Sequence, residues 1–391
     1  MKYNFDKVID RSGTSAEKVE GLKHIWGRTD LIPLWVADMD FATAPFVTDA
    51  IRKRCENEVL GYTGKPDSYY NAIINWVKQR YDLIVTKEVI NFVPGIVPGI
   101  GMAMNCFTQK GDKVMIQPPV YHPFAWVTTR NERTLVTNPL KWENGMYRMD
   151  LDAFRELIKG CKLFILCNPH NPGGVVWTEA ELRAIADICY DEKVLVFSDE
   201  IHADLTLPPH THRPFATVSE KARMNSVTFM SPSKAFNMPG LSASHALIFN
   251  EDLRKRFRIY MDAGELDMGH VFAFLSVEAA YSHGTEWLDQ CLAYIQGNID
   301  FVDEFLKKHA PKIKAIRPEA SYLVWLDCRE LELSQKDLNE FFVDKAHLAL
   351  NDGEMFGKEG IGFMRLNVAS PRCIIEKAMK QLADAYQLYI K

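Results

Sequence analysis

Three short polar stretches in the middle of the chain carry the residue types that could perform chemistry. They are an asparagine-containing turn at 168–174 (NPHNPGG), an acidic segment at 199–202 (DEIH) and a lysine segment at 231–234 (SPSK). Singly, each has an ordinary structural explanation: the first can be a plain turn, Asp199 can cap a helix, and Lys234 can lie on the surface. Their regular separation is more informative, because Asn171 precedes Asp199 by 28 residues and Asp199 precedes Lys234 by 35.

An amide, a carboxylate and a primary amine in this order fit catalysis with pyridoxal 5′-phosphate (PLP). A lysine amine can hold the aldehyde of the cofactor as a Schiff base. A carboxylate can keep the pyridine nitrogen protonated, so that the ring accepts electrons. Hydroxyls and free N–H groups at a helix N-terminus can bind the phosphate. The sequence therefore predicts a PLP site in which Lys234 carries the cofactor and Asp199 pairs with the pyridine nitrogen.

The hydrophobic pattern predicts the elements that position these residues. Residues 162–168 form a continuous apolar run, typical of a strand that is buried on both faces. Residues 178–190 follow with apolar residues at helical spacing, and Thr178 with Glu181 forms a capping-box pattern at the start. Further apolar runs, which we expect to be strands, follow at 194–198, 226–230 and 245–249. This alternation predicts an α/β fold with a mostly parallel sheet, whose strand ends form the binding crevice.

The pattern changes after about residue 285. The elements expected there are a long amphipathic helix, two strands and a closing helix, at 287–309, 322–327, 361–367 and 371–386. We therefore expect a large PLP-binding domain over residues 45–286. A smaller α+β domain is expected to combine residues 1–44 with residues 287–391.

Composition excludes several functional classes. The 391 residues carry a net charge of -5, and the one dense basic run, 254–258, is expected to be the solvated face of a helix, so we expect no nucleic-acid partner. The eight cysteines form no CxxC pair and have no histidine at ligand spacing, which argues against a metal site or a disulfide framework. No apolar stretch approaches the ~20 residues that span a membrane, and the N-terminus has no apolar leader. The expected location is the cytoplasm.

Seven sequence blocks, three of which contain the polar stretches described above, are shared with a known group of enzymes. They are 5–11 (FDKVIDR), 34–41 (LWVADMDF), 167–174 (CNPHNPGG), 198–205 (SDEIHADL), 231–241 (SPSKAFNMPGL), 318–327 (PEASYLVWLD) and 364–372 (MRLNVASPR). Through these blocks the chain resembles PLP-dependent enzymes of fold type I, the aspartate aminotransferase-like fold of the aminotransferase class I/II superfamily. Within that superfamily it resembles the MalY/PatB-type cystathionine β-lyases, which are carbon–sulfur lyases.

The resemblance implies a role for each residue around the cofactor ring. Lys234 would hold PLP and later remove the proton from the substrate Cα, and Asp199 would pair with the pyridine nitrogen. Tyr121 would stack on the ring, so Lys234, Asp199 and Tyr121 are the expected catalytic residues. His202 would hydrogen-bond the ring oxygen O3′, and Asn171 would contact O3′ and the substrate carboxylate. The ordinary alternative for His202 is a histidine whose hydrogen bonds are satisfied at a helix end.

The resemblance also implies how the phosphate is held. Ser231 and Ser233 would contact it, together with the backbone N–H groups of Ile96 and Val97 at a strand-to-helix turn. Tyr62 matches a tyrosine that reaches the phosphate of the neighbouring subunit. The resemblance therefore implies a homodimer with shared active sites.

On the substrate side, the resemblance assigns Arg365 to the α-carboxylate and places Ala37 next to the substrate. One departure is Ser242, which stands where many aminotransferases have an arginine for the phosphate. This difference favours the lyase branch and leaves the cationic partner of the phosphate unassigned. The expected activity is β-elimination from cystathionine or another S-substituted cysteine. An aminotransferase and a PLP-binding regulatory protein are the alternatives, and the natural substrate and pathway stay open.

Overall fold

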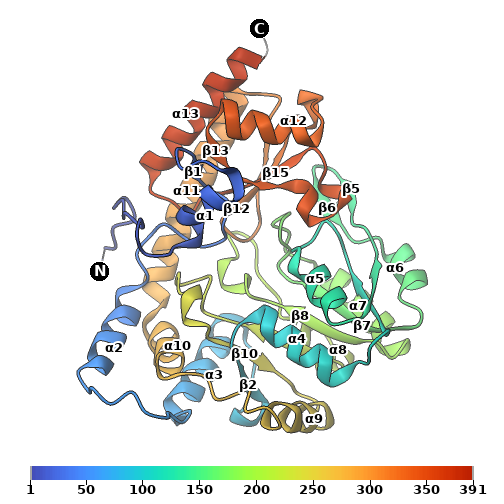
Figure 1. The fold of residues 1–391 in the computed structure, drawn as a ribbon. Coiled ribbons are helices and arrows are strands. Elements are labelled where there is room, and N and C mark those ends of the chain that lie inside the picture. Colours follow the sequence, from blue (N-terminus) through green and yellow to red (C-terminus); the bar gives the residue numbers. More distant parts are fainter. Residues whose placement is uncertain (1, 390–391) are drawn as a thin grey trace.

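A seven-stranded sheet forms the centre of the computed structural model, which describes residues 2–389 (Figure 1). Its strands, in spatial order, are β2 (Ile90–Val93), β10 (Ser244–Leu247), β9 (Ser226–Met230), β8 (Leu195–Asp199), β7 (Cys161–Cys167), β3 (Lys113–Ile116) and β4 (Thr134–Thr137). All neighbours are parallel except that β10 runs antiparallel to both β2 and β9. The sheet is thus mostly parallel, as predicted.

Helices cover both faces of this sheet because successive strand residues point to opposite sides. In β7, Leu163 and Ile165 pack toward α4 (Ile96–Phe107), α5 (Pro123–Arg130) and α9 (Glu251–Asp262), whereas Phe164 and Leu166 pack toward the opposite layer. The helices of that opposite layer are α6 (Leu151–Leu157), α7 (Glu179–Asp191), α8 (Glu220–Met224), α3 (Asp67–Tyr81) and α10 (Val271–His283). The sheet is therefore buried on both faces, which explains its continuous apolar runs.

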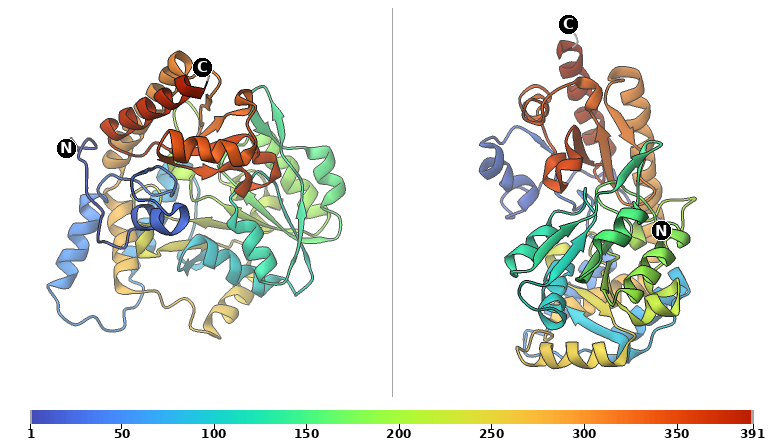
Figure 2. Two further views of the ribbon diagram at one scale, coloured as in Figure 1. Left: turned by 45° about the horizontal axis from the view of Figure 1, so that its top comes forward. Right: turned by 90° about the vertical axis from the view of Figure 1, so that its right-hand side faces the viewer.

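A second sheet lies above the first in Figure 1 and contains four antiparallel strands. They are β11 (Lys314–Ile316), β12 (Leu323–Asp327), β15 (Phe363–Asn367) and β14 (Asn351–Asp352). The helices beside it are α11 (Thr285–His309), α12 (Gln335–Glu340) and α13 (Arg372–Tyr389). The N-terminal segment joins this upper part: α1 (Glu17–Trp26) lies beside it in both views of Figure 2, and β1 (Ile32–Pro33) pairs with β13 (Leu348–Ala349). The remaining α-helix is α2 (Pro45–Cys55), and the remaining strands, β5 (Lys141–Glu143) and β6 (Met146–Arg148), form a hairpin.

The predicted elements are present, with small shifts at their ends. Thr178 and Glu181 form the predicted capping box of α7. The strand expected at 361–367 begins at Phe363, because Gly362 has a φ of 85° and interrupts extended backbone. The strand expected at 245–249 is antiparallel, because the connection from β9 contains no crossover helix that would restore the direction. The division into domains at residues 45 and 286 remains a prediction.

Within residues 2–389, no helix combines the length and the apolar character that a bilayer span requires. Among the same residues, no cluster of three or more His, Cys, Asp or Glu side chains could hold a metal ion. All eight cysteines are free thiols, and Cys167 and Cys189 are buried in the core, as their apolar surroundings predict.

Candidate active site

One cavity of about 210 Å³ lies beyond the carboxyl ends of the central strands β7, β8 and β9. The predicted site residues that line it are Ala37, Ile96, Val97, Tyr121, Asn171, Asp199, His202, Ser233 and Lys234. They come from segments far apart in the sequence, and the strand ends bring them together as expected for parallel strands. The cavity is therefore the candidate active site.

Lys234 follows β9 and places its amine inside the protein. The Nζ group donates a hydrogen bond to the carbonyl of Ala37, and the hydroxyl of Tyr322 donates to the same carbonyl at 2.9 Å. Burial, assisted by the positive charge of Arg365, lowers the pKa of the Lys234 amine to about 8. An amine with this pKa is neutral far more often at neutral pH than a free lysine, which suits a nucleophile and a base.

Asp199 is the last residue of β8 and is buried at the floor of the cavity. One carboxylate oxygen accepts a hydrogen bond from the backbone N–H of Ile201 at 3.1 Å. Burial raises the pKa of the carboxyl to about 7. A cationic group placed beside Asp199 would offset this cost, so the position suits a partner for a protonated ring nitrogen.

His202 and Tyr121 also line the cavity. The ring nitrogen Nδ1 of His202 is buried without a hydrogen-bond partner among the described residues. Burial lowers the pKa of His202 to about 3, so the ring is neutral and can donate one hydrogen bond to a bound group. Tyr121 is half-buried, and its ring meets Phe124 edge-on at 5.7 Å, which fixes the face that it presents.

Asn171 and Arg365 form the substrate side of the site. Arg365 does not line the cavity directly, but its Nη1 donates to Oδ1 of Asn171 at 3.1 Å. Its Nη2 donates to the carbonyl of Trp35 at 3.1 Å and to Asn351. The Nε–H of Arg365 is buried without a partner among the described residues. The two Nη groups thus hold the guanidinium in place, and the Nε–H is left as a donor that could bind a carboxylate.

The cavity lining also offers hydroxyls and backbone N–H groups. Helix α4 begins at Ile96, directly after Gly95, whose φ of 131° favours glycine. The N–H groups of Ile96 and Val97 lie in the first turn of this helix, where backbone donors lack intrahelical partners. Ser233 lines the cavity there, together with Ser242 and Ser244. This arrangement suits a phosphate, although Lys234 is the one cationic residue among the described residues that line the cavity.

Besides Arg365, two other predicted residues do not line the cavity. Ser231 is behind Ser233: its hydroxyl is within hydrogen-bond distance of Ser233 Oγ, at 2.9 Å, and of the Ala243 carbonyl, at 2.8 Å. Its expected contact with the phosphate remains a prediction, and in the structure it supports Ser233. Tyr62 is 98% exposed and does not line the cavity of its own chain. Its expected role in a neighbouring subunit also remains a prediction.

The sequence patterns missed Tyr322, Asn351 and Cys167 as site residues. The thiol of Cys167 lines the cavity and accepts a hydrogen bond from the backbone N–H of Asn171 at 3.4 Å. The position of Cys167 at a strand end could have indicated this. Nothing in the spacing of Tyr322 or Asn351 links either residue to Lys234 or Arg365.

The donor and acceptor groups of the cavity fit PLP. The buried Nδ1 of His202 and Nε of Arg365 have no partner among the described residues, and both could bind polar groups of a cofactor or substrate. The other groups that fit PLP are the buried carboxylate of Asp199, the Lys234 amine with its lowered pKa, and the backbone N–H groups in the first turn of α4.

The model of the family "Aminotransferase class I and II" matches residues 29–382. The chain belongs to this family. It is 38% identical to the cystathionine beta-lyase PatB of Bacillus subtilis over 98% of this chain and 99% of PatB. A PLP-bound putative aminotransferase from Clostridium difficile has a TM-score of 0.96 and 40% identity, covering 98% of this chain and all of that chain. The PLP-bound C–S lyase from Staphylococcus hominis has a TM-score of 0.91 and 35% identity, covering 98% of each chain. The fold is that of PLP-dependent enzymes of fold type I, as the sequence predicts.

Proposed function

We propose that the protein is a PLP-dependent carbon–sulfur β-lyase that cleaves cystathionine or another S-substituted L-cysteine to a thiol, pyruvate and ammonia. The observation that carries this proposal is full-length similarity to PatB, which is named a cystathionine beta-lyase, combined with a cavity whose groups fit the cofactor. The C–S lyase of Staphylococcus hominis, with PLP bound, supports the same reaction class.

The site residues would have different roles in substrate binding and proton transfer. The unpaired Nε–H of Arg365 and the amide of Asn171 would hold the substrate carboxylate. Asp199 would keep the ring nitrogen protonated. When bound, PLP supplies an electron sink for the electron pair left at the substrate Cα.

Lys234 would have two successive tasks. Its amine would hold the cofactor until the substrate amine replaces it, and would then accept the proton from Cα. Burial favours the neutral amine that both tasks need, since it lowers the pKa to about 8. Tyr121 and His202 would hold the ring in one orientation during this exchange.

Aminotransferase activity is the second candidate, because the family and the Clostridium difficile neighbour carry that name. The two activities need the same residues around the ring. They differ in whether the group at Cβ leaves or a proton returns to the cofactor carbon. Ser242, which lines the cavity where many aminotransferases have an arginine, supports the lyase.

We also propose that the protein is a homodimer in which Tyr62 completes the partner's site. Tyr62 lies in the segment between α2 and α3, where Val59 and Leu60 are exposed as well. Three large apolar or aromatic side chains exposed within four residues support burial against a second subunit.

The product formed from L-cystathionine without a keto acid tests the proposal. A lyase releases homocysteine, pyruvate and ammonia over many turnovers, and the visible absorption of the lysine-bound cofactor persists. An aminotransferase stops after one equivalent and resumes only when a keto acid is added. L-Alanine is the matched control, because it has the same amine and carboxylate but no leaving group at Cβ. A stall with cystathionine and with other S-substituted cysteines would refute the lyase.

A further inference from the structure

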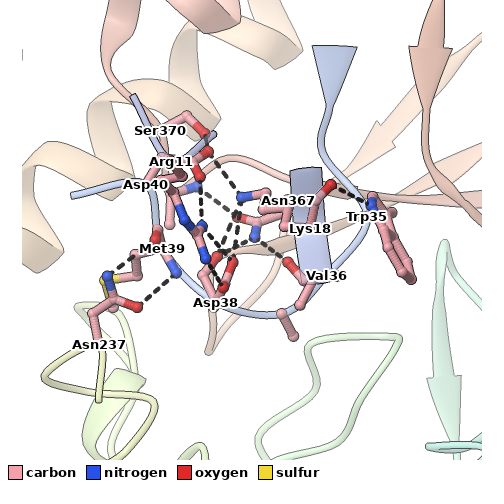
Figure 3. A network of polar contacts seen from close by, with 12 residues as sticks. Arg11, Lys18, Trp35, Val36, Asp38, Met39, Asp40, Asn237, Asn367 and Ser370 are labelled. Carbon is pink, nitrogen blue, oxygen red and sulfur yellow. Dashed lines mark hydrogen bonds and ion pairs between the residues drawn. The ribbon is translucent and has the colours of Figure 1, made fainter. Parts of the chain in front are cut away.

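The segment from Trp35 to Met39 forms neither a helix nor a strand and contributes Ala37 to the cavity, yet side chains bind all of its carbonyls. Figure 3 shows the bonds to the carbonyls of Val36, Asp38 and Met39. Arg365 donates to the carbonyl of Trp35, and Lys234 and Tyr322 donate to that of Ala37. Asn367 donates to the carbonyls of Val36 and Asp38, and Asn237 donates to that of Met39. The backbone of this segment is therefore positioned by side chains that come from several distant parts of the chain.

Asn367 holds the two carbonyls on either side of Ala37. Its Nδ2 donates to Val36 O at 2.7 Å and to Asp38 O at 2.6 Å, while its Oδ1 accepts from the N–H of Ala369 at 2.8 Å. The side chain is completely buried at the end of β15. With both neighbours held by one amide, the Ala37 carbonyl has little freedom to turn away from Lys234.

An ion cluster next to Asn367 also holds the same segment (Figure 3). The buried Lys18 of α1 contacts Asp40 at 2.8 Å and Asp38 at 3.6 Å, and it also donates to the Asp38 carbonyl at 3.4 Å. Arg11 contacts the same two carboxylates, at 2.6 Å for Asp38 and 3.1 Å for Asp40. Two cations and two carboxylates leave the cluster neutral, so it can fix the backbone without adding net charge near the lysine.

We propose that Asn367 is a positioning residue: it holds the Ala37 carbonyl as the acceptor for the Lys234 amine whenever that amine is not bonded to the cofactor. This inference rests on the proposed function and deepens it. The amine is free in the cofactor-free protein and after a substrate amine has displaced it. A hydrogen bond from an ammonium is stronger than one from a neutral amine, so the carbonyl stabilises the protonated lysine that exists after Cα has lost its proton.

The pKa of the free Lys234 amine depends on its hydrogen bond to the Ala37 carbonyl, so a change in this pKa reports the loss of that bond. The charged groups that face the amine are Asp38, Asp199 and Arg365, and the polar rings around it are Tyr121, Tyr322 and His202. Asn367→Leu changes none of these charges and is close in size. If the carbonyl turns away, the ammonium loses an acceptor and the pKa falls.

Competitive acetylation of the protein, followed by mass spectrometry of the Lys234 peptide, gives this pKa without any assay of turnover. We would label the cofactor-free chain and also the PLP-loaded protein saturated with 2-methylalanine, which displaces the lysine but has no Cα proton. In both forms Asn367→Leu should lower the pKa of Lys234 by about one unit, the scale of a lost charged hydrogen bond.

Asn298 provides a matched control. It is completely buried, its Nδ2 also donates to two carbonyls, those of Val368 and Ser370, and its Oδ1 also accepts one hydrogen bond. It makes no hydrogen bond to residues 35–39. Asn298→Leu should lower the thermal midpoint as Asn367→Leu does and leave the pKa of Lys234 unchanged. Equal pKa shifts in both variants, or none in Asn367→Leu, would overturn the proposal.

A second variant covers the case in which Asn367→Leu fails to fold. The double change Lys18→Met with Asp40→Asn removes one positive and one negative charge, keeps the cluster neutral and removes the contacts of the Lys18 amine with Asp40, Asp38 and the Asp38 carbonyl. It should lower the pKa of Lys234 in the same direction, and an unchanged pKa would count against the proposal. Borohydride reduction separates this inference from the proposed function: a cofactor fixed to another residue refutes the function, whereas a cofactor on Lys234 with an unmoved pKa refutes only the inference.

Discussion

Arg365 donates a hydrogen bond from Nη1 to Oδ1 of Asn171 at 3.1 Å and thereby connects the two largest sheets of the described residues. Arg365 lies on β15 of the four-stranded sheet, and Asn171 follows β7 of the seven-stranded sheet. A substrate carboxylate bound by both residues would lie at the junction of the sheets. If both residues bind the substrate, a movement of one sheet against the other would change the distance between its two contacts.

Arg365→Lys should raise KM for the amino acid by about tenfold or more, with a smaller effect on kcat. Lysine keeps the charge but has one nitrogen, whereas Arg365 uses Nη1 and Nη2 to hold its position and leaves Nε for the substrate. Steady-state kinetics on the thioether substrate measure the effect. Arg372→Lys is the control, because Arg372 packs on Phe301 and does not line the cavity. An unchanged KM in Arg365→Lys would contradict the assignment.

Asp199→Asn should leave PLP attached and reduce kcat by roughly two orders of magnitude, the scale of losing a main electrostatic stabiliser. The amide has the size of the carboxyl group but cannot carry the negative charge that keeps the ring nitrogen protonated. Absorption spectra measure the bound cofactor, and product release measures kcat. Asp204→Asn is a matched control, since Asp204 is also buried with a raised pKa yet lies outside the cavity lining. Wild-type turnover in Asp199→Asn would refute the role.

The sequence predicts the residues at the strand ends because their positions follow from periodicity. Asn171, Asp199 and Lys234 each follow or end a buried parallel strand, and such strands share one edge. By contrast, the support of Ala37 depends on contacts of Lys18 with Asp40 and of Asn367 with the carbonyls of residues 36 and 38, which no repeat or motif relates. The backbone from 35 to 39 has no periodic pattern at all, so its shape is set entirely by tertiary hydrogen bonds. The antiparallel direction of β10 was missed for a similar reason, because apolar runs do not encode direction.

Tyr62→Phe should weaken the retention of PLP several-fold while the protein stays dimeric. The change removes one hydroxyl from a side chain that is 98% exposed in a single chain and that would reach the partner's phosphate. Equilibrium dialysis measures PLP release, and sedimentation measures the assembly state. Tyr190→Phe, at another exposed tyrosine, should change neither quantity. A wild-type protein that remained active as a monomer on dilution would exclude the shared site.

His245→Leu should reduce the pH dependence of stability between about pH 4 and about pH 6. His245 is fully buried, neither ring nitrogen has a partner among the described residues, and burial lowers its pKa to about 3. In this range the unfolded histidine, with a pKa near 6.5, gains a proton and the folded one does not, so stability falls as pH falls. Removing the group should lower the slope of the unfolding free energy by about 1.4 kcal/mol per pH unit.

Urea unfolding of the cofactor-free protein at several pH values measures this slope. The exposed His24 is the control residue, and His24→Leu should leave the slope as it is in the wild type. A steeper slope in His245→Leu, or the same slope as the wild type, would contradict a buried neutral imidazole.

The hydrogen bonds from Arg365 and Asn367 to the segment at 35–39 also impose an order on biosynthesis. Lys234 leaves the peptidyl-transferase centre roughly 10 s before Asn367, at elongation rates of about 5–20 residues per second. Until then the carbonyls of Trp35, Val36 and Asp38 lack these donors, and β1 lacks β13. In a nascent chain, Lys234 is therefore synthesised before the segment at 35–39 has the hydrogen bonds that hold it in place. The hydrogen bonds of Asn367 to the neighbours of Ala37 can therefore form only after the C-terminal strand has been translated and has emerged from the ribosome.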